Sequence, residues 1–368
     1  MEWVIGFTVF ICLLYFALVS GFIVGWKRIY AFVPKGNENL TSSNLLISVV
    51  VACRDEENYV RNLIACMAQQ SNQNFELILV NDHSTDATRH HIKKAEALYP
   101  KIQLIDAVGY GKKNALREGI LHSKGNLIVT TDADCLPSYH WLESIASYQQ
   151  KYNCDLLICP VKLSGKDSFF TYLQVLEFTS LVASAAGAAG IGMPILCNGA
   201  NLVFKKKMWI ACQNDLHPEE QSGDDIFLLE SVKKRGGKIR FLKSESAFVT
   251  TKQAGNLLSL IKQRRRWSAK SRFYTDWQLI LTALEIFSVS LLLLFLLISS
   301  FTNPTYLYLL GAVFVFKYLV DSIFLSVVGE FFQLNNIWLY SFFLSIIYPF
   351  YVVFIALSAI AVRPKRWN

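Results

Sequence analysis

The chain has 368 residues, of which 53% are hydrophobic and 17% charged, and its formal net charge at pH 7 is +8. Much of the basic charge lies next to apolar segments, as in residues 262–272, which favours an anionic membrane surface as a partner and argues against nucleic acid. Eight cysteines show neither C-x-x-C spacing nor a paired framework, so the sequence predicts neither a structural zinc site nor disulfides.

The amino-terminal end is an apolar run. Residues 3–26 carry no charge and are long enough, at about 1.5 Å per residue, to cross the roughly 30 Å hydrocarbon core of a bilayer. A cleavable signal peptide is the competing interpretation, but no basic region precedes the run and no small-residue cleavage site follows it. Lys27, Arg28 and Lys35 come next, which by the positive-inside rule places the following domain in the cytoplasm. We therefore expect an anchor at residues 1–28, in an integral protein of the bacterial inner membrane.

Three more candidate spans lie within residues 278–362, at 278–300, 306–328 and 337–362. The middle one contains Lys317 and Asp321 on one helical face, where a charged pair serves helix packing or a polar path. One span before the domain and three after it would place the basic tail, residues 363–366, outside, against the positive-inside preference. Either one segment is re-entrant or interfacial, or other determinants outweigh the charges of the tail.

Between these ends, residues 45–250 alternate short apolar strands with amphipathic helices. Strands are predicted at residues 45–52, 75–80, 102–106 and 127–130, and helices at residues 57–70, 88–98 and 114–122. Repeated β-α-β units of this size predict an α/β fold with a doubly wound parallel sheet, which binds its ligands along the carboxyl edge.

Acidic residues follow three of the predicted strands: Glu56 near the end of the first, Asp82 after the second, and Asp132 with Asp134 after the fourth. Residues two apart project to the same side, so Asp132 and Asp134 can share one hard cation. Carboxylates gathered along one edge are hard to ionise together without such a cation, which predicts a divalent metal. No GxGxxG follows the first strand and no GxxxxGK[ST] occurs, so dinucleotide oxidoreductases and P-loop kinases lose their main support.

Beyond the predicted sheet the pattern is less regular. Residues 169–193 are rich in Ala, Gly and Phe but carry Glu177, which predicts an interfacial or acceptor-side helix in preference to a span. Asp224 and Asp225 precede an amphipathic helix at residues 226–235, although a helix N-cap needs only one of them. The predicted interfacial segment 251–277 contains the run Gln-Arg-Arg-Arg-Trp. A topology signal would explain its arginines but does not require the Gln and the Trp.

Taken in order, these pieces resemble the membrane-integrated family 2 glycosyltransferases, whose signature is D, D-x-D, (E/G)-D-D and Q-(Q/R)-x-R-W. That family includes the cellulose, chitin, hyaluronan and poly-N-acetylglucosamine synthases and the ceramide glucosyltransferases. The matching residues here are Asp82, Asp132 with Asp134, Asp224 with Asp225, and residues 263–267. The resemblance covers roughly residues 45–275 and the flanking spans, and it implies a GT-A fold and a hexosyltransferase activity.

The resemblance implies a donor site for a UDP-sugar. The donor-binding residues that it implies lie at predicted strand ends and in the basic turn 109–113, and they are Ala52, Arg54, Glu56, Asp82, Lys112 and Asp132. In this assignment Asp82 reads the uracil, with Ala52, Arg54 and Glu56 lining the same base pocket, and Lys112 lies on the diphosphate side. Asp134 holds Mg²⁺ or Mn²⁺ against the diphosphate.

The resemblance also implies the catalytic and acceptor residues. Asp225 is similar to the catalytic base of the family, with Asp224 as the next candidate, and Gln263, Arg266 and Trp267 resemble the pocket that grips the diphosphate and floors the acceptor site. The chemistry agrees, because a metal and an arginine can neutralise the leaving diphosphate while one carboxylate takes the acceptor proton. A single displacement inverts the anomeric centre, so an α-linked UDP-sugar gives a β-linked product.

The sequence leaves two acceptor classes open: a growing polysaccharide, and a membrane lipid such as a ceramide, a diacylglycerol or a polyprenyl phosphate. The acid two positions past Asp225 is missing, as in the hyaluronan and chitin type. Four predicted spans are fewer than those of synthases that thread a polymer through their own helices, which fits a single transfer to a lipid equally well. A transporter with a nucleotide-binding domain and a nucleotidyltransferase on a similar fold are the remaining alternatives.

Overall fold

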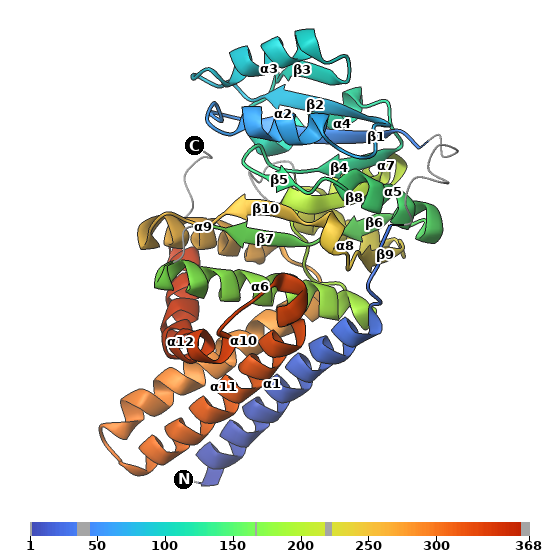
Figure 1. The fold of residues 1–368 in the computed structure, drawn as a ribbon. Helices are drawn as coiled ribbons and strands as arrows, with labels where there is room; N and C mark the ends of the chain where they lie inside the picture. Colours follow the sequence, from blue (N-terminus) through green and yellow to red (C-terminus); the bar gives the residue numbers. More distant parts are fainter. Residues whose placement is uncertain (1, 35–44, 166–167, 218–222, 362–368) are drawn as a thin grey trace. The chain divides into compact units, whose positions relative to one another are not determined.

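The computed structural model describes residues 2–34, 45–165, 168–217 and 223–361 (Figure 1). The chain divides into two compact units: an α/β unit from residues 29–164 and 196–252, and a helical unit from residues 1–28, 165–195 and 253–365. Residues 165–195, expected within the soluble domain, therefore belong to the helical unit, because their long apolar helix packs on the amino-terminal one. Lys35 and the basic tail 363–366 lie outside the described residues.

The α/β unit is built on a seven-stranded sheet with the order β3-β2-β1-β4-β8-β6-β9. Its strands are β1 (Ile47–Cys53), β2 (Phe75–Asn81), β3 (Ile102–Asp106), β4 (Leu127–Thr130), β6 (Leu156–Ile158), β8 (Leu202–Lys205) and β9 (Ile239–Phe241). β1 to β4 run parallel, as predicted. The predicted parallel sheet is mixed in its second half, because β8 leaves a short 3₁₀ turn at the carboxyl end of β4 and runs antiparallel to β4 and β6.

Helices surround this sheet: α2 (Val60–Ala68), α3 (Thr88–Leu98), α4 (Lys112–His122), α5 (Trp141–Tyr152), α7 (Lys206–Cys212) and α8 (Asp224–Lys234). All seven residues of β1 are buried, as expected for a central strand that is covered on both faces. Helix α2 begins at Val60, three residues later than predicted. The side chain of Glu57 accepts a hydrogen bond from the amide of Ala87, and the amide of Glu57 donates one to Asp86. These bonds hold the preceding loop in a non-helical conformation.

A second, three-stranded sheet has the order β5-β10-β7, with β5 at Leu136–Pro137, β7 at Val161–Ser164 and β10 at Val249–Lys252. The sequence did not predict this sheet, because β5 has only two residues and β7 and β10 mix apolar and polar residues over four positions. Asn201 is fully buried in the same unit. Its side-chain amide donates to the carbonyls of Pro160 and Ala247 and accepts from the indole of Trp141. Asn201 thus fixes the connections around both sheets.

The helical unit contains α1 (Glu2–Arg28), α6 (Phe169–Gly190), α9 (Leu257–Ala269), α10 (Trp277–Ser300), α11 (Thr305–Phe332) and α12 (Ile337–Ala361). In the described part of the chain, α1, α6, α10, α11 and α12 are long and apolar enough to cross a membrane. Such a set of helices indicates membrane association. Helix α6 meets the same criteria of length and composition as the four predicted spans, with 56% of its most apolar window buried. Its interfacial position stays a prediction.

The charged pair of α11 is packed inside this unit. Lys317 is 2% exposed and bonds to Asp321, which also accepts a hydrogen bond from the hydroxyl of Tyr15 in α1. The ammonium of Lys317 lies 5.4 Å from the ring centroid of Tyr15 and 5.1 Å from that of Tyr348 in α12. The buried ammonium therefore has a carboxylate partner, and the pair joins α11 to α1 and α12.

Helices α1 and α6 approach each other at glycines. A Cβ on Gly25 would lie 1.8 Å from the carbonyl oxygen of Gly187, and a Cβ on Gly190 would lie 2.1 Å from that of Gly25. Because backbone atoms cannot yield as a flexible side chain can, we expect Gly25→Ala to lower the thermal unfolding midpoint of the detergent-solubilised protein by several degrees. Gly6 of the same helix has no atom within 4 Å of a Cβ, so Gly6→Ala is the matched control. Equal midpoints for the two variants would contradict this account.

Candidate active site

The candidate site lies at the carboxyl edge of the parallel strands. The register pairs Cys53 with Asn81 and Val50 with Thr130, so the residues that follow these strands meet along one edge. The turn before β8 joins the same edge, because the hydroxyl of Thr130 donates to the carbonyl of Gly199 at 2.8 Å. Side chains that are far apart in the sequence are thereby brought together, as expected for a sheet of this class.

An acidic cluster follows β4. The ligand atoms of Asp132, Asp134 and Cys135 lie within 4.8 Å of one another. Burial and the neighbouring Asp132 raise the pKa of Asp134, and burial with the two carboxylates raises the pKa of the Cys135 thiol far above its usual range. A neutral thiol is a poor ligand for a hard cation, whereas paired carboxylates suit one. Sequence reasoning found the two acids and missed Cys135, although its position next to Asp134 was a signal.

Lys112 connects this cluster to a second pair of acids. Its ammonium donates to Asp132 Oδ1 at 2.5 Å, and its side chain is 26% exposed. Burial lowers the pKa of Lys112, but Asp132, Asp224 and Asp225 together raise it above the ordinary value of a lysine. One cation therefore lies in the field of three predicted site carboxylates from β4 and α8.

The two acids of α8 are not explained by helix capping. Gly223 occupies the N-cap position with a φ of +97° and has no side chain that could cap the helix. Asp225 instead accepts hydrogen bonds from the amide of Gly199 at 3.2 Å and from the amide of Ile226 at 2.8 Å. Asp224 and Asp225 both line a cavity of about 230 Å³. The carboxylate of Asp225 is thus held in one orientation at the edge of an open space.

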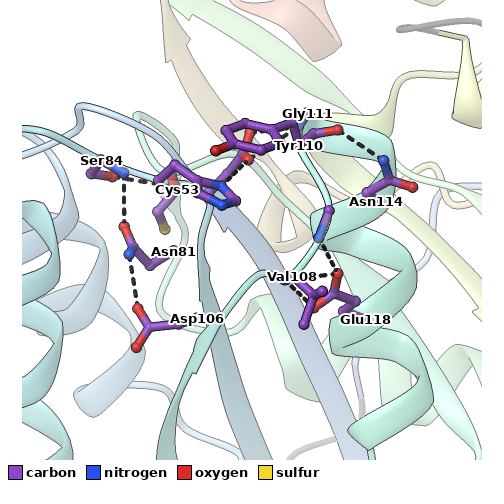
Figure 2. Close-up of polar contacts among 12 residues, drawn as sticks. Cys53, Asn81, Ser84, Asp106, Val108, Tyr110, Gly111, Asn114 and Glu118 are labelled. Carbon is purple, nitrogen blue, oxygen red and sulfur yellow. Dashed lines mark hydrogen bonds and ion pairs between the residues drawn. The ribbon is translucent and has the colours of Figure 1, made fainter.

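Asp82 is bonded to the loop between β3 and α4. It is fully buried, and both of its oxygens are 3.0 Å from the donating amide of Gly111. Figure 2 shows how the loop is closed: Glu118 accepts from the amides of Val108 and Gly109, and the side chain of Asn114 donates to the carbonyl of Tyr110.

Tyr110 stacks on His83, with ring centroids 3.8 Å apart, yet remains 71% exposed. The ring of His83 also contacts Asp82, with Nδ1 at 3.2 Å from Oδ1. Sequence reasoning missed this aromatic pair, because its two members come from loops that follow different strands.

The loop after β1 brings Glu56 to the acidic cluster. Ala52 is a buried residue of β1, and Asp55 accepts a hydrogen bond from the amide of Thr85. Burial, followed by the charges of Asp134 and Asp132, raises the pKa of Glu56 to about 7. Arg54 directly follows β1. Glu56, predicted to line a base pocket, is therefore electrostatically linked to the pair predicted to hold a metal.

Gln263, Arg266 and Trp267 lie on α9 of the helical unit, where Arg266 is exposed and the other two are half-buried. Arg264 of the same run is buried and forms an ion pair with Glu177 of α6. From the sequence, Arg264 was only one of the two residue types allowed at the second position of the motif Q-(Q/R)-x-R-W.

Residues 48–208 match the family described as glycosyl transferase family 2. This segment is therefore a domain of the glycosyltransferase family 2 type. An uncharacterized glycosyltransferase of Haemophilus influenzae is 32% identical to it over 107 residues, which are 29% of this chain and 33% of that protein. A beta-monoglucosyldiacylglycerol synthase of Nostoc sp. is 23% identical over 244 residues, which are 64% of this chain and 51% of that protein. A poly-beta-1,6-N-acetyl-D-glucosamine synthase of Staphylococcus aureus is 22% identical over 227 residues, or 60% and 53%.

The chain spans about half, or less, of the length of these curated relatives. A mannosyltransferase from Pyrobaculum calidifontis, solved in complex with GDP-Man and Mn²⁺, superposes with a TM-score of 0.57 at 16% identity, covering 97% of this chain and 96% of that one. This likeness shows the fold, a GT-A type α/β domain with long apolar helices. The predicted family and fold class are confirmed.

Proposed function

We propose that this glycosyltransferase moves a sugar from a UDP-sugar to a lipid or glycan acceptor at the membrane, with inversion at the anomeric carbon. The observation that carries the proposal is the position of Lys112, which bonds to Asp132 and lies in the field of Asp224 and Asp225. Lys112 thereby links Asp132 of the pair proposed to hold a metal to Asp225, the proposed base. Its ammonium can also bind a diphosphate. Sugar transfer from a nucleotide requires all three groups close together.

We propose Mg²⁺ or Mn²⁺ as the cofactor. Asp134 would hold the ion, with Asp132 meeting the donor ribose or the water shell of the ion; their carboxylates and the raised pKa of Asp134 fit a hard divalent cation. When bound, the ion supplies charge neutralisation for the leaving diphosphate. The mannosyltransferase of similar fold was solved with Mn²⁺ and a nucleotide sugar.

The protein's own residues would divide the remaining tasks. Asp225 takes the proton of the acceptor hydroxyl, and the amide of Gly199 holds one of its oxygens so that the carboxylate keeps its direction. Lys112 binds the diphosphate. Asp82 recognises the base, together with Ala52 of β1 and with Arg54 and Glu56 of the loop that follows β1. Gln263, Arg266 and Trp267 serve the diphosphate and the acceptor.

Metal binding should release a proton from Glu56. Its pKa of about 7 arises from burial and from the unneutralised charges of Asp134 and Asp132, so a divalent cation should lower it. We therefore expect Mn²⁺ affinity, measured by titration calorimetry, to rise as pH increases from about 6 to about 8, since only the deprotonated form favours the cation. Glu56→Gln should flatten this dependence. An unchanged pH profile in the variant would contradict the link.

Relatives of both acceptor classes match this chain to a similar extent, one named for a glucosyl-diacylglycerol product and one for a polysaccharide. Radiolabelled UDP-glucose, UDP-N-acetylglucosamine, UDP-galactose, UDP-glucuronate and GDP-mannose, given in turn to membranes that carry the protein, separate the alternatives. Label in an organic extract identifies a lipid acceptor, and label retained on a size column identifies a polymer. Release of pyrophosphate, or solute flux without transfer, would overturn the proposal.

A transfer assay in sealed vesicles tests the proposed location. Lys27 and Arg28 end α1, and basic residues on this side of a span favour the cytoplasm. We place the catalytic domain at the cytoplasmic face of a bacterial inner membrane, where UDP-sugars are made. Sealed inverted vesicles should then use added donor without detergent, whereas right-side-out vesicles should require detergent.

A further inference from the structure

Arg264 is buried and forms a two-point contact with Glu177, which its place in the motif does not predict. It is 5% exposed, and its partner Glu177 on α6 is 8% exposed. The guanidinium donates through Nε to Glu177 Oε1 at 3.0 Å and through a terminal nitrogen to Oε2 at 2.5 Å. This paired geometry is the strong form of an arginine–carboxylate interaction. Burying two charges is costly unless each has a partner with good geometry, as both have here.

The remaining terminal nitrogen of Arg264 donates to Gln263 Oε1 at 2.6 Å. Because a guanidinium has donors and no acceptor, the carbonyl end of the Gln263 amide must face Arg264. The amino end then faces away and is available as a donor. The same guanidinium lies 4.2 Å from the ring centroid of Trp267, where its charge is attracted to the face of the indole. One side chain thus contacts both half-buried members of the predicted diphosphate and acceptor pocket.

The carboxylate of Glu177 is held in turn. The hydroxyl of Tyr351 in α12 donates to Glu177 Oε1 at 3.4 Å, and Phe178, next to Glu177 on α6, lies 6.5 Å from Trp267 between ring centroids. The direction of the guanidinium is therefore set by residues of two other helices. Its own three nitrogens are all used, which a lysine ammonium on a flexible stem could not reproduce.

We propose that Glu177 and Arg264 are positioning residues for sugar transfer. Glu177 fixes the guanidinium of Arg264, which turns the Gln263 amide so that its N–H donors face an anionic group and holds the indole of Trp267 in one orientation. This assignment rests on the proposed function, in which Gln263 serves the diphosphate of the nucleotide sugar. A Gln263 amide turned the other way would present a carbonyl oxygen and repel that diphosphate.

The first test is Arg264→Lys in the full-length protein in nanodiscs. The lysine keeps a charge for Glu177 but cannot also bond to Gln263 in the same geometry. We expect an unfolding midpoint close to that of the unmodified protein and a kcat for transfer lower by about 10- to 100-fold, the size of effect that misplacing a substrate-contacting group produces. Lys262→Gln, on an exposed residue of the same helix, is the control and should keep kcat. Unchanged kcat in Arg264→Lys would overturn the proposal.

The second test exchanges the charges, with Glu177→Arg and Arg264→Glu combined. Each single change leaves a buried unpaired charge and should lower the unfolding midpoint, and the combination should recover much of that loss. Transfer should remain impaired in the combination, because a glutamate at position 264 cannot donate to Gln263 or attract the face of Trp267. Recovery of transfer along with stability would show that the pair only holds helices together, and would overturn the proposal.

The failure of this inference and the failure of the proposed function are distinguishable. If the unmodified protein transfers no sugar from any of the donors tested, the proposed function fails first. If it transfers sugar and both position-264 variants that fold keep its kcat and its affinity for UDP in the presence of Mn²⁺, the positioning role fails alone.

Discussion

Asp225→Asn is expected to leave UDP binding intact and to lower the rate of sugar transfer by roughly 10³-fold, within the range that a general base supplies. The asparagine keeps the size of the side chain, and its one oxygen can accept from one of the two amides, Gly199 and Ile226, that bond to different oxygens of Asp225, so the fold should survive with one hydrogen bond fewer. It cannot accept the proton of the acceptor hydroxyl. The measurement is the single-turnover rate with saturating UDP-sugar, beside UDP affinity from titration calorimetry.

Asp224→Asn is the matched control, since Asp224 lines the same cavity and contributes to the field at Lys112. We expect its effect on the rate to be much smaller than that of Asp225→Asn. If Asp225→Asn retains a near-normal rate while Asp224→Asn does not, the base is Asp224. If both retain it, neither acid takes the proton and the proposed mechanism is wrong.

Asp134→Ala should abolish metal-dependent nucleotide binding. Removing one of two paired carboxylates halves the charge offered to a hard cation, and we expect Mn²⁺ affinity to fall by about 100-fold or more, because such ions depend on carboxylate charge and number. UDP should then bind equally weakly with Mn²⁺ and with a chelator present. Calorimetric titration of UDP under both conditions measures this difference.

Cys135→Ala separates the carboxylates from the thiol beside them. The sulfur of Cys135 lies in the same cluster, but burial keeps the thiol protonated by raising its pKa. Mn²⁺ affinity should therefore be nearly unchanged in this variant. A loss as large as that of Asp134→Ala would make the thiol a ligand and would point to a softer metal than Mg²⁺ or Mn²⁺.

Local sequence patterns were sufficient to predict the parallel half of the sheet and the residues at its edge. An apolar run such as β1 is readable because every one of its residues is buried. Asp132 and Asp134 come shortly after the end of β4, so the apolar run that predicts this strand also predicts that they lie at the edge of the sheet. The antiparallel return of β8 was not readable, because its direction depends on the turn at Gly199–Asn201 and not on its own composition.

The same limit applies to individual side chains. Glu56 was assigned to a base pocket, and that assignment stays a prediction; its pKa is raised by burial and by the charges of Asp134 and Asp132, which follow β4, three strands later in the chain. The stacked pair of His83 and Tyr110 was not foreseen, since each residue is an ordinary loop residue until the two loops meet. Contacts of this kind depend on strand register and loop closure, and neither is encoded in a short window of sequence.

The sequence by itself determined the family, the apolar helices and the order in which Asp82, Asp132, Asp134 and Asp225 occur along the chain. These features follow from local periodicity and from residue type at fixed spacing. Only the tertiary structure decided which of the charges meet. Lys112 reaches Asp132 across 20 residues, and Arg264 reaches Glu177 across 87. The physical reason is that the packing of whole helices and strands sets the distance between two charges. The number of residues between them in the sequence does not.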